Sequence, residues 1–305
     1  MAVSNITHIK SISAYHRLRG LPEPEHPLVS VVRVDDFAFT NKDEELPLIM
    51  DYYSISLKRN CGWIRYGRQS YDYDTGVMYF VAPGQLFTVQ HKLDEPKQSG
   101  WMLLVHPDLI WNTALANTIH KYEYFGYEVN EALWVSEKEE SIIVDIMQNI
   151  HSECQANLDK FSKQIIITQI EGLLSYAERF YHRQFITREK SSHEILTRLE
   201  TFLNHYFEGE QLVLKGPPSV GEVASELNIS ANYLSSLLRI HTGLNTQQHI
   251  QQRLIDKAKE KLSTTNLSIS EIAYELGFEH LQSFSKLFKS KTQLSPKAFR
   301  RQFRW

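Results

Sequence analysis

The sequence predicts an α+β chain of two domains, in which a β-rich N-terminal domain precedes an all-α C-terminal domain. Its 305 residues exceed what one hydrophobic core commonly organises. Short segments rich in β-branched and aromatic residues stop near Ile110, and helical periodicity replaces them from there onward. The last third of the chain contains an internal repeat with a spacing of 49 to 50 residues, which is typical of a duplicated helical unit.

The N-terminal domain, which we place at 1–185, begins with a series of predicted strands. Turn-forming residues separate short runs that are rich in β-branched and aromatic side chains. These runs are Val29–Val34, Tyr52–Lys58, Ile64–Tyr66, Gly76–Val81, Leu86–Gln90 and Trp101–Val105. Several short strands at regular spacing predict a barrel or a sandwich, although their alternation does not specify the strand order.

Two amphipathic helices are expected at about 137–181, joined by a short polar turn. Ser136 and Glu139 have the spacing of a capping box at the start of the first helix. Apolar residues recur at helical spacing in both halves of this range, which predicts a helical hairpin. Its apolar stripes either pack on the strands or form the face of a dimer, and both can hold. The polar segment 186–192 is expected to be a linker or a continuation of the second helix.

The C-terminal domain, 193–305, contains two similar units at about 220–239 and 269–289. In each unit a short helix, a sharp turn and a second helix follow one another, which is the order of a helix-turn-helix motif. Asn228 and Gly277 fall at the two turns, where the chain needs residues that tolerate positive φ. The helical run from Thr246 to Thr264, between the units, contains no Gly or Pro. It therefore predicts a continuous helix that holds the two units at a fixed separation.

The second helix of each unit carries a polar face opposite its apolar face. Helical spacing places hydrogen-bonding side chains on that face, with a basic residue near its C-terminal end. These residues are Asn232, Ser235, Ser236 and Arg239 in the first unit, and Gln282, Ser285, Lys286 and Lys289 in the second. Such a face can read base edges and contact phosphates. We expect Asn232 to contact a base and Lys289 to contact the DNA backbone.

The charge distribution agrees with a polyanionic partner. Residues 1–192 hold 19 Lys and Arg against 25 Asp and Glu, whereas residues 193–305 hold 14 against 11. From Ser285 to Trp305 there are seven basic residues and no acidic one. A basic end on an otherwise acidic chain favours binding to nucleic acid.

Cysteine usage and hydropathy predict a cytoplasmic protein without a membrane span. Cys61 and Cys154 give neither a disulfide framework nor the spacing of a zinc site. The sequence contains no run of apolar residues long enough for a transmembrane helix. The stretch from Met1 to Gly20 lacks the continuous apolar region of a secretory signal.

Residues 193–303 resemble the DNA-binding domain of AraC/XylS-type regulators, a likeness that the second unit carries most clearly. Its motif runs Ile269-Ser270-Glu271-Ile272-Ala273, Leu276-Gly277-Phe278, Phe284, Phe288-Lys289 and Leu294-Ser295-Pro296-Lys297-Ala298-Phe299-Arg300. The resemblance covers just over a third of the chain and implies a transcriptional regulator that binds double-stranded DNA. It also implies that bases meet Asn232, Ser235 and Ser236 in the first unit, and Gln282, Ser283 and Lys286 in the second.

Residues 29–110 resemble, more weakly, the cupin-like effector domain often found ahead of such a DNA-binding unit. Gly76–Gly84 looks like the strand and turn of that fold, and the resemblance implies a cupin-like β-barrel. Enzymatic cupins hold a metal with a His-x-His pair and a nearby Glu, but neither His91 nor His106 has an imidazole neighbour two residues away. We therefore expect no metal, no cofactor and no catalytic residue.

The aromatic residues of this barrel either line a small-molecule pocket or fill the core. They are Tyr52, Tyr53, Trp63, Tyr66, Tyr71, Tyr73, Tyr79, Phe80, Phe87 and Trp101. Arg65 or Arg68 either binds an anionic effector or lies on an outward strand face.

We expect a transcriptional regulator, not an enzyme, whose N-terminal domain senses a small molecule, dimerises, or does both. Its expected partners are double-stranded DNA, a small-molecule effector, a second copy of the chain and RNA polymerase. The first alternative is a cupin-type metalloenzyme fused to a DNA-binding domain. The second is an architectural DNA binder without an effector, which a filled barrel interior would favour.

Overall fold

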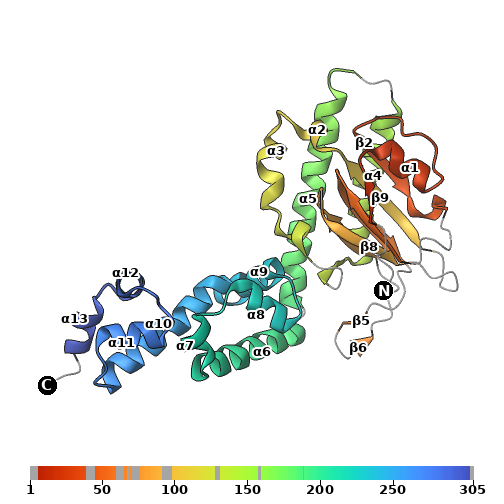
Figure 1. Cartoon of the computed structure of the whole chain (residues 1–305). Coiled ribbons are helices and arrows are strands. Elements are labelled where there is room, and N and C mark those ends of the chain that lie inside the picture. Colours follow the sequence, from red (N-terminus) through yellow and green to blue (C-terminus); the bar gives the residue numbers. More distant parts are fainter. Residues whose placement is uncertain are drawn as a thin grey trace. The chain divides into compact units, whose positions relative to one another are not determined.

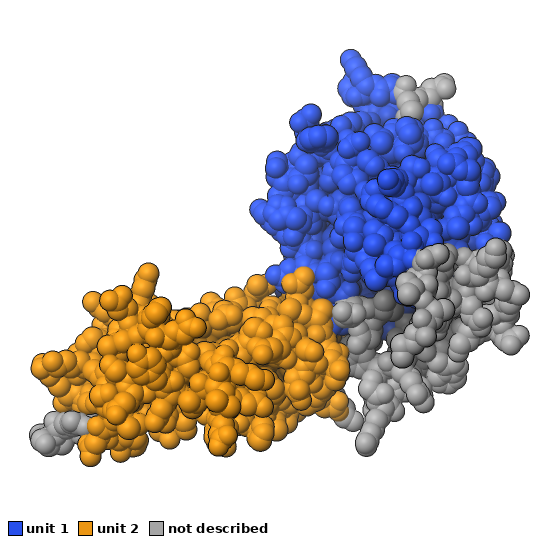
Figure 2. Space-filling model, viewed as in Figure 1, with its two compact units in different colours: residues 1–184 blue, residues 185–305 orange. Residues whose placement is uncertain are grey.

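The computed structural model divides the chain into two compact units, Met1–Gln184 and Phe185–Trp305 (Figures 1 and 2). The first unit combines strands with helices and the second is helical, which confirms the predicted α+β class. The structure describes residues 6–38, 45–59, 65–66, 69–70, 76–90, 98–127, 131–156, 159–187 and 189–302.

The strands of the first unit form separate sheets. They are β1 Thr7–Ile9, β2 Val29–Arg33, β3 Glu45–Met50, β4 Tyr53–Arg59, β5 Arg65–Tyr66, β6 Gln69–Ser70, β7 Val77–Val81, β8 Leu86–Gln90, β9 Ser99–Val105 and β10 Leu133–Trp134. A five-stranded antiparallel sheet has the order β10-β7-β4-β9-β2, and a three-stranded sheet has the order β1-β3-β8. Strands β5 and β6 pair with each other. The ladders among the described strands do not close into a ring, so the cupin-like barrel stays a prediction.

Most predicted strands are confirmed to within two residues at each end, namely those that became β2, β4, β7, β8 and β9. In the predicted strand 64–66, Ile64 lies outside the described residues, whereas Arg65 and Tyr66 form β5. Strands β1, β3, β6 and β10 were not predicted from the sequence. Strands β1 and β10 have only three and two residues, and β3 contains Pro47, which lacks a backbone donor and lowers strand propensity.

Buried apolar side chains of the described residues pack between the two larger sheets. Residues from β1, β3, β9 and helix α1 (Ile12–Leu18) form one apolar cluster there. The cluster consists of Ile9, Ile12, Tyr15, Val34, Phe37, Leu48, Met50, Tyr52, Met102 and Leu104, with Phe87 packed against it. Tyr52 and Phe87 of the predicted aromatic set therefore belong to the core, whereas Trp63, Tyr71 and Tyr73 lie outside the described residues.

The opposite face of the five-stranded sheet is covered by the predicted hairpin, α4 (Glu137–Gln155) and α5 (Ser162–Thr187). Helix α4 begins with the predicted capping box of Ser136 and Glu139. Glu140 of α4 pairs with Arg59 of β4 at 2.7 Å, and the buried Tyr124 hydroxyl donates to a carbonyl of α5 at 2.9 Å. The hairpin therefore packs on the strands, which is one of the two predicted alternatives.

The hairpin is longer than predicted. Helix α5 continues past residue 181 to Thr187, and α6 (Glu189–Glu208) begins two residues later. The segment 186–192, predicted as a linker or a helix continuation, is therefore helical where the structure describes it. No Gly or Pro occurs there to end the helix, and polar residues suit a helix exposed to water. The remaining helices of the first unit are α2 Pro107–Ile110 and α3 Ala114–Thr118.

The second unit contains the predicted duplicated motif. After α6 come α7 Gln211–Lys215, α8 Val220–Leu227, α9 Ala231–Thr242, α10 Thr246–Thr264, α11 Ile269–Glu275, α12 Leu281–Thr292 and α13 Pro296–Arg301. Helices α8 and α9 form the first helix-turn-helix, and α11 and α12 form the second. The uninterrupted α10 connects them, as the absence of Gly and Pro predicted (Figure 1).

Candidate nucleic-acid interface and effector pocket

The two helix-turn-helix units share the same backbone design at their turns. Asn228 ends α8 in the left-handed region with φ 56°, and its N–H donates to the Ser225 carbonyl at 3.1 Å. Gly277 follows α11 with φ 77°, and its N–H donates to the Tyr274 carbonyl at 2.9 Å. In both helix-turn-helix motifs the N–H of the next residue, Ile229 or Phe278, donates to a carbonyl of the preceding helix. The sequence repeat is therefore a structural repeat.

The apolar face of each second helix is buried, which leaves the polar face outward. Leu234, Leu237 and Leu238 of α9 are buried, and so are Phe284 and Phe288 of α12. The rings of Phe284 and Phe288 pack on each other with centroids 5.8 Å apart. This burial determines which side chains of α9 and α12 face solvent.

The candidate residues on α9 differ in their exposure. Asn232 and Arg239 are exposed, whereas Ser235 and Ser236 are half-buried. The Ser235 hydroxyl shares a 2.9 Å hydrogen bond with the hydroxyl of Thr246, a fully buried residue at the start of α10. Ser235 therefore faces α10, and its hydroxyl already has a partner in the absence of DNA.

The candidate residues on α12 are more exposed. Gln282, Ser283, Lys286 and Lys289 are all exposed, and only Ser285 is half-buried. In the described part of the chain, none of the lysines of α12 and α13 forms an ion pair; these are Lys286, Lys289, Lys291 and Lys297. Unpaired surface cations on one helical unit are suited to contact phosphates.

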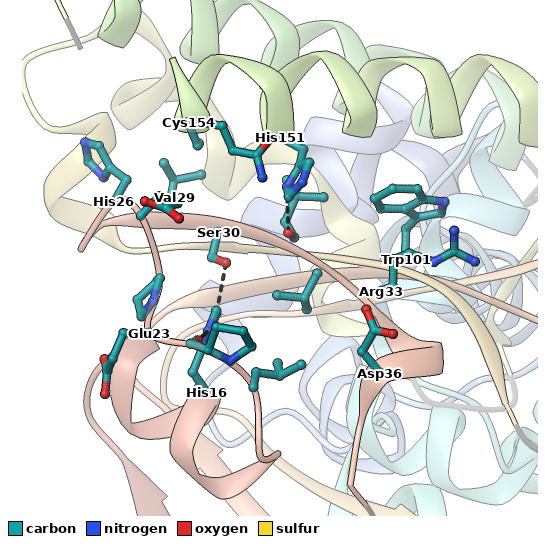
Figure 3. Close-up of a pocket in the computed structure, with 17 residues that line it drawn as sticks. His16, Glu23, His26, Val29, Ser30, Arg33, Asp36, Trp101, His151 and Cys154 are labelled. Carbon is teal, nitrogen blue, oxygen red and sulfur yellow. Dashed lines mark hydrogen bonds between the residues drawn. The ribbon is translucent and has the colours of Figure 1, made fainter. Parts of the chain in front are cut away.

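The first unit contains a pocket of about 260 Å³ at the edge strand β2 (Figure 3). Residues from α1, the loop 21–28, β2, β9 and α4 line it. On one side, the buried His16 lies 2.9 Å from the hydroxyl of Ser30 through its Nε2 atom. On the other side, His151 Nδ1 donates to the Val31 carbonyl at 3.1 Å. The pocket therefore wraps around both faces of β2 and contacts α4 directly.

The unpaired charges in this pocket are negative. Arg33 pairs with Asp35 at 3.4 Å and lies over the Trp101 ring, 5.4 Å from its centroid. Glu23 pairs with Arg17 outside the pocket at 3.0 Å. The carboxylates of the lining residues Glu25 and Asp36 have no hydrogen bond or ion pair within the described residues.

Two further lining groups are uncharged at neutral pH. Burial lowers the pKa of His26, whose Nδ1 accepts the Leu28 N–H at 3.0 Å. Burial raises the pKa of the Cys154 thiol to about 11, so that the thiol is protonated and a poor nucleophile. The pocket offers acceptors without an activated nucleophile.

Sequence reasoning did not single out this pocket, because its residues come from separate elements without a spacing signal. Of its lining residues, Trp101, Cys154 and the predicted strand that became β2 were noted from the sequence, and for other reasons. The candidate anion ligands fall elsewhere: the side chain of Arg65 and all of Arg68 lie outside the described residues. His91 lies outside them as well, and His106 accepts the Asp108 N–H at the start of α2.

The described residues contain no group of three or more His, Cys, Asp or Glu side chains arranged to hold a metal ion. In that same part of the chain, no helix is both long and apolar enough to cross a membrane.

The comparisons with known proteins concern mainly the second unit. Residues 223–302 match the family described as "Helix-turn-helix domain". The HTH-type transcriptional regulator YfiF of Bacillus subtilis is 30% identical over 224 residues, which cover 73% of this chain and 56% of YfiF. The Msm operon regulatory protein of Streptococcus mutans is 35% identical over 83 residues, 27% of this chain and 30% of that protein. The chain thus spans less than two thirds of either relative.

Among solved structures, the C-terminal domain of the two-component response regulator yesN from Fusobacterium nucleatum is 30% identical to this chain. The match has a TM-score of 0.29 and covers 33% of this chain and 96% of that domain. The family match and the similar regulators agree with the motif recognised in the sequence. Residues 223–302 are therefore a helix-turn-helix domain.

Proposed function

We propose that this chain is a transcriptional regulator that binds double-stranded DNA through α9 and α12. The duplicated helix-turn-helix carries the proposal, because two such units on one rigid connecting helix can enter neighbouring segments of the major groove. The regulators to which the chain is similar support it. The further partner that we propose is RNA polymerase, because it is the enzyme whose transcription such a regulator controls.

Exposure on the two helices suggests distinct roles for the candidate residues. Asn232 and Gln282 occupy equivalent exposed positions near the helix starts, where an amide can pair with adenine in two hydrogen bonds. Lys286 is one turn further, and Lys289 and Arg239 are nearly two turns further, where phosphates lie closer than base edges. Ser236 and Ser283 lie beside these positions, and Ser235 contributes less because it bonds to Thr246.

Selection of bound DNA from a random pool by the full chain tests this function. We expect one preferred sequence with two separated elements. A variant with both Asn232→Ala and Gln282→Ala is expected to lose the preference while still binding random DNA. A control with Asn204→Ala and Gln211→Ala, on α6 and α7, is expected to select the same sequence as the wild type. A pool that shows no enrichment by the wild type would refute the function.

We infer that the first unit binds a small molecule in the pocket at β2. Among the described residues, an apolar cluster packs between the sheets, whereas the pocket at β2 is open and carries polar groups, which makes it the better candidate for an effector site. Its unpaired carboxylates, Glu25 and Asp36, favour a small amine over an anion. His151, Cys154 and Gln155 place the last turns of α4 against the bound molecule, and α5 follows α4 directly in the chain.

A thermal-shift comparison tests the pocket with putrescine, choline and acetate as probes. We expect an amine to raise the Tm of the full chain and acetate to leave it unchanged. A ligand at about 100 times its Kd adds about 2.7 kcal/mol of stability. Glu25→Gln with Asp36→Asn should abolish the shift, and the charge-matched control Glu194→Gln with Glu279→Gln should preserve it. Equal shifts in both variants would exclude this pocket.

We also propose that the chain forms a homodimer through the outward face of α5. Ile165 and Tyr176 of this face are exposed, as is Phe161 directly before α5, although all three are large and apolar. Gly172 lies on the same face, and no atom lies within 4 Å of a Cβ added there, which permits close approach of a second helix. Sedimentation at micromolar concentration is expected to show a dimer for the wild type and a monomer for Ile165→Asp. The exposed control Ser175→Asp should remain dimeric, and a monomeric wild type would contradict the proposal.

A further inference from the structure

The turn of the second helix-turn-helix touches the segment that precedes the first. A Cβ atom added to Gly277 would lie 2.3 Å from the Gly216 Cα and 2.6 Å from the Leu212 carbonyl oxygen. Both of these atoms belong to backbone that cannot rotate away. Backbone therefore packs directly on backbone here, between α7 with its following residue and the turn after α11.

Positive φ alone does not explain glycine at this turn. The first helix-turn-helix adopts nearly the same turn with Asn228 at φ 56°, and a side chain is accommodated there. At Gly277 the φ is 77°, but the neighbouring Gly216 also occupies the space of a side chain. The contact between the units therefore adds a second requirement for glycine at residue 277.

Helix α6 holds Gly216, the partner of Gly277 in this contact, in place. The Tyr206 hydroxyl of α6 donates to the Gly216 carbonyl at 3.1 Å, and the Gly216 N–H donates to the Leu212 carbonyl at 3.0 Å. Gly216 itself has φ 78°, and a Cβ there would lie 3.2 Å from the Gly277 carbonyl oxygen. Helix α6 packs in turn against α8 of the first helix-turn-helix. A continuous chain of contacts thus leads from α8 to Gly277.

This contact adds to the covalent connection through α10. Helix α10 ends at Thr264, where the backbone becomes extended before α11 begins, and the Lys261–Glu275 ion pair at 2.6 Å bridges that junction. A helix joined to its neighbour at one end can pivot about the junction. A second contact away from the junction removes this freedom.

We propose that the Gly216–Gly277 contact is a joint that sets the separation and angle of α9 and α12, and thereby the spacing between DNA elements that the protein accepts. The proposal rests on the proposed function, in which both helices bind one duplex. Gly277 and Gly216 are positioning residues that do not touch DNA themselves.

The substitution Gly277→Ala tests the joint, and Gly243→Ala is its matched control. Gly243 has φ 76°, but nothing lies within 4 Å of a Cβ added there, so the control carries the backbone strain without the collision. Affinity is measured for the selected site and for sites with one base pair inserted or removed between the elements. We expect the wild type and Gly243→Ala to prefer the selected spacing, and Gly277→Ala to lose about tenfold of that preference. Equal weakening at every spacing would overturn the proposal.

A DNA-independent measurement separates failure of the joint from failure of the proposed function. Spin labels at Asn232→Cys and Gln282→Cys, with Cys61 and Cys154 replaced by Ala, report the distance between α9 and α12 in the full chain. We expect a narrow distance distribution for the parent and for Gly243→Ala, and a broader or displaced one for Gly277→Ala. If Gly277→Ala does not fold, Gly216→Ala makes the milder collision and replaces it. Unchanged distributions in a folded variant would reject the joint even if DNA binding is confirmed.

Discussion

The two helix-turn-helix units share a backbone design, but their recognition helices differ in what surrounds them. In α9, Tyr233 is buried against Phe185, with ring centroids 5.0 Å apart, and Ser235 bonds to α10. The residue of α12 at the position of Tyr233 is the exposed Ser283. Helix α12 also carries the unpaired Lys286 and Lys289 at the positions where α9 carries Ser236 and Arg239.

The two copies of the motif are therefore suited to different contacts with DNA. The first helix-turn-helix is anchored in its own domain, and α9 offers mainly neutral hydrogen-bonding groups, which suits reading of bases. The second helix-turn-helix offers more exposed cations on α12, which suits sequence-independent affinity for phosphates.

The anchoring of α9 by Phe185 gives the largest expected effect. Phe185 is buried, and its carbonyl accepts a hydrogen bond from the Ser192 hydroxyl at 3.1 Å. A fragment 185–305 is expected to unfold cooperatively in urea, whereas 193–305 should be less stable by about 3–5 kcal/mol, the cost of deleting a buried Phe. Phe185→Ala in the longer fragment should reproduce most of this loss. Equal stability of the two fragments would show that α9 needs no such anchor.

The division between reading and affinity is tested by Asn232→Ala and Lys289→Ala in the full chain. Loss of a bidentate contact to a base should cost Asn232→Ala about 1–3 kcal/mol at the preferred site and little on random DNA. Lys289→Ala should weaken both DNAs by a similar factor and lower the salt slope by about one unit. Titrations of both duplexes at several salt concentrations give the answer. A reversal of the two patterns would mean that the roles are exchanged.

Ser235 should behave as a structural residue despite its place on the recognition helix. Ser235→Ala removes a partner of the buried Thr246 hydroxyl and should lower the free energy of unfolding by about 1 kcal/mol. Its preference among DNA sequences should stay that of the wild type. The matched position Ser285→Ala serves as the control, because no hydrogen bond of its side chain links it to α10. A change of sequence preference without loss of stability would place Ser235 at the DNA.

The capping boxes of the two units should give the smallest effect, and an equal one. Hydrogen bonds from the backbone N–H groups of Ser219 and Ser268 hold the pKa of Glu222 and Glu271 below the ordinary value of a glutamate side chain. A carboxyl with a lowered folded-state pKa stabilises the fold above its unfolded pKa, and this stability disappears as the pH falls through the folded pKa. The Tm difference between the wild type and Glu222→Gln should therefore be largest near pH 7 and vanish in strong acid. Glu271→Gln should match it, and a pH-independent difference would argue against this cause.

Much of the fold could be predicted because it depends on local patterns. The capping box at Ser136, the turn at Asn228 and the buried face of α9 all follow from residue type and spacing within about a dozen residues. Strands β1 and β10 were missed because two or three residues carry no measurable alternation. The pocket was missed because His16, Arg33 and His151 converge from α1, β2 and α4.

Periodicity and turn residues act over short distances, and they were enough to predict the α+β class, the duplicated helix-turn-helix and the polar faces of α9 and α12. The packing of elements in space, in contrast, established that the hairpin covers a sheet, that Ser235 faces α10 and that the pocket lies at the edge of β2. It also decided why residue 277 is glycine, because the Gly216 backbone comes from a segment about sixty residues earlier in the chain. Such contacts depend on how elements pack in space, which no local pattern encodes.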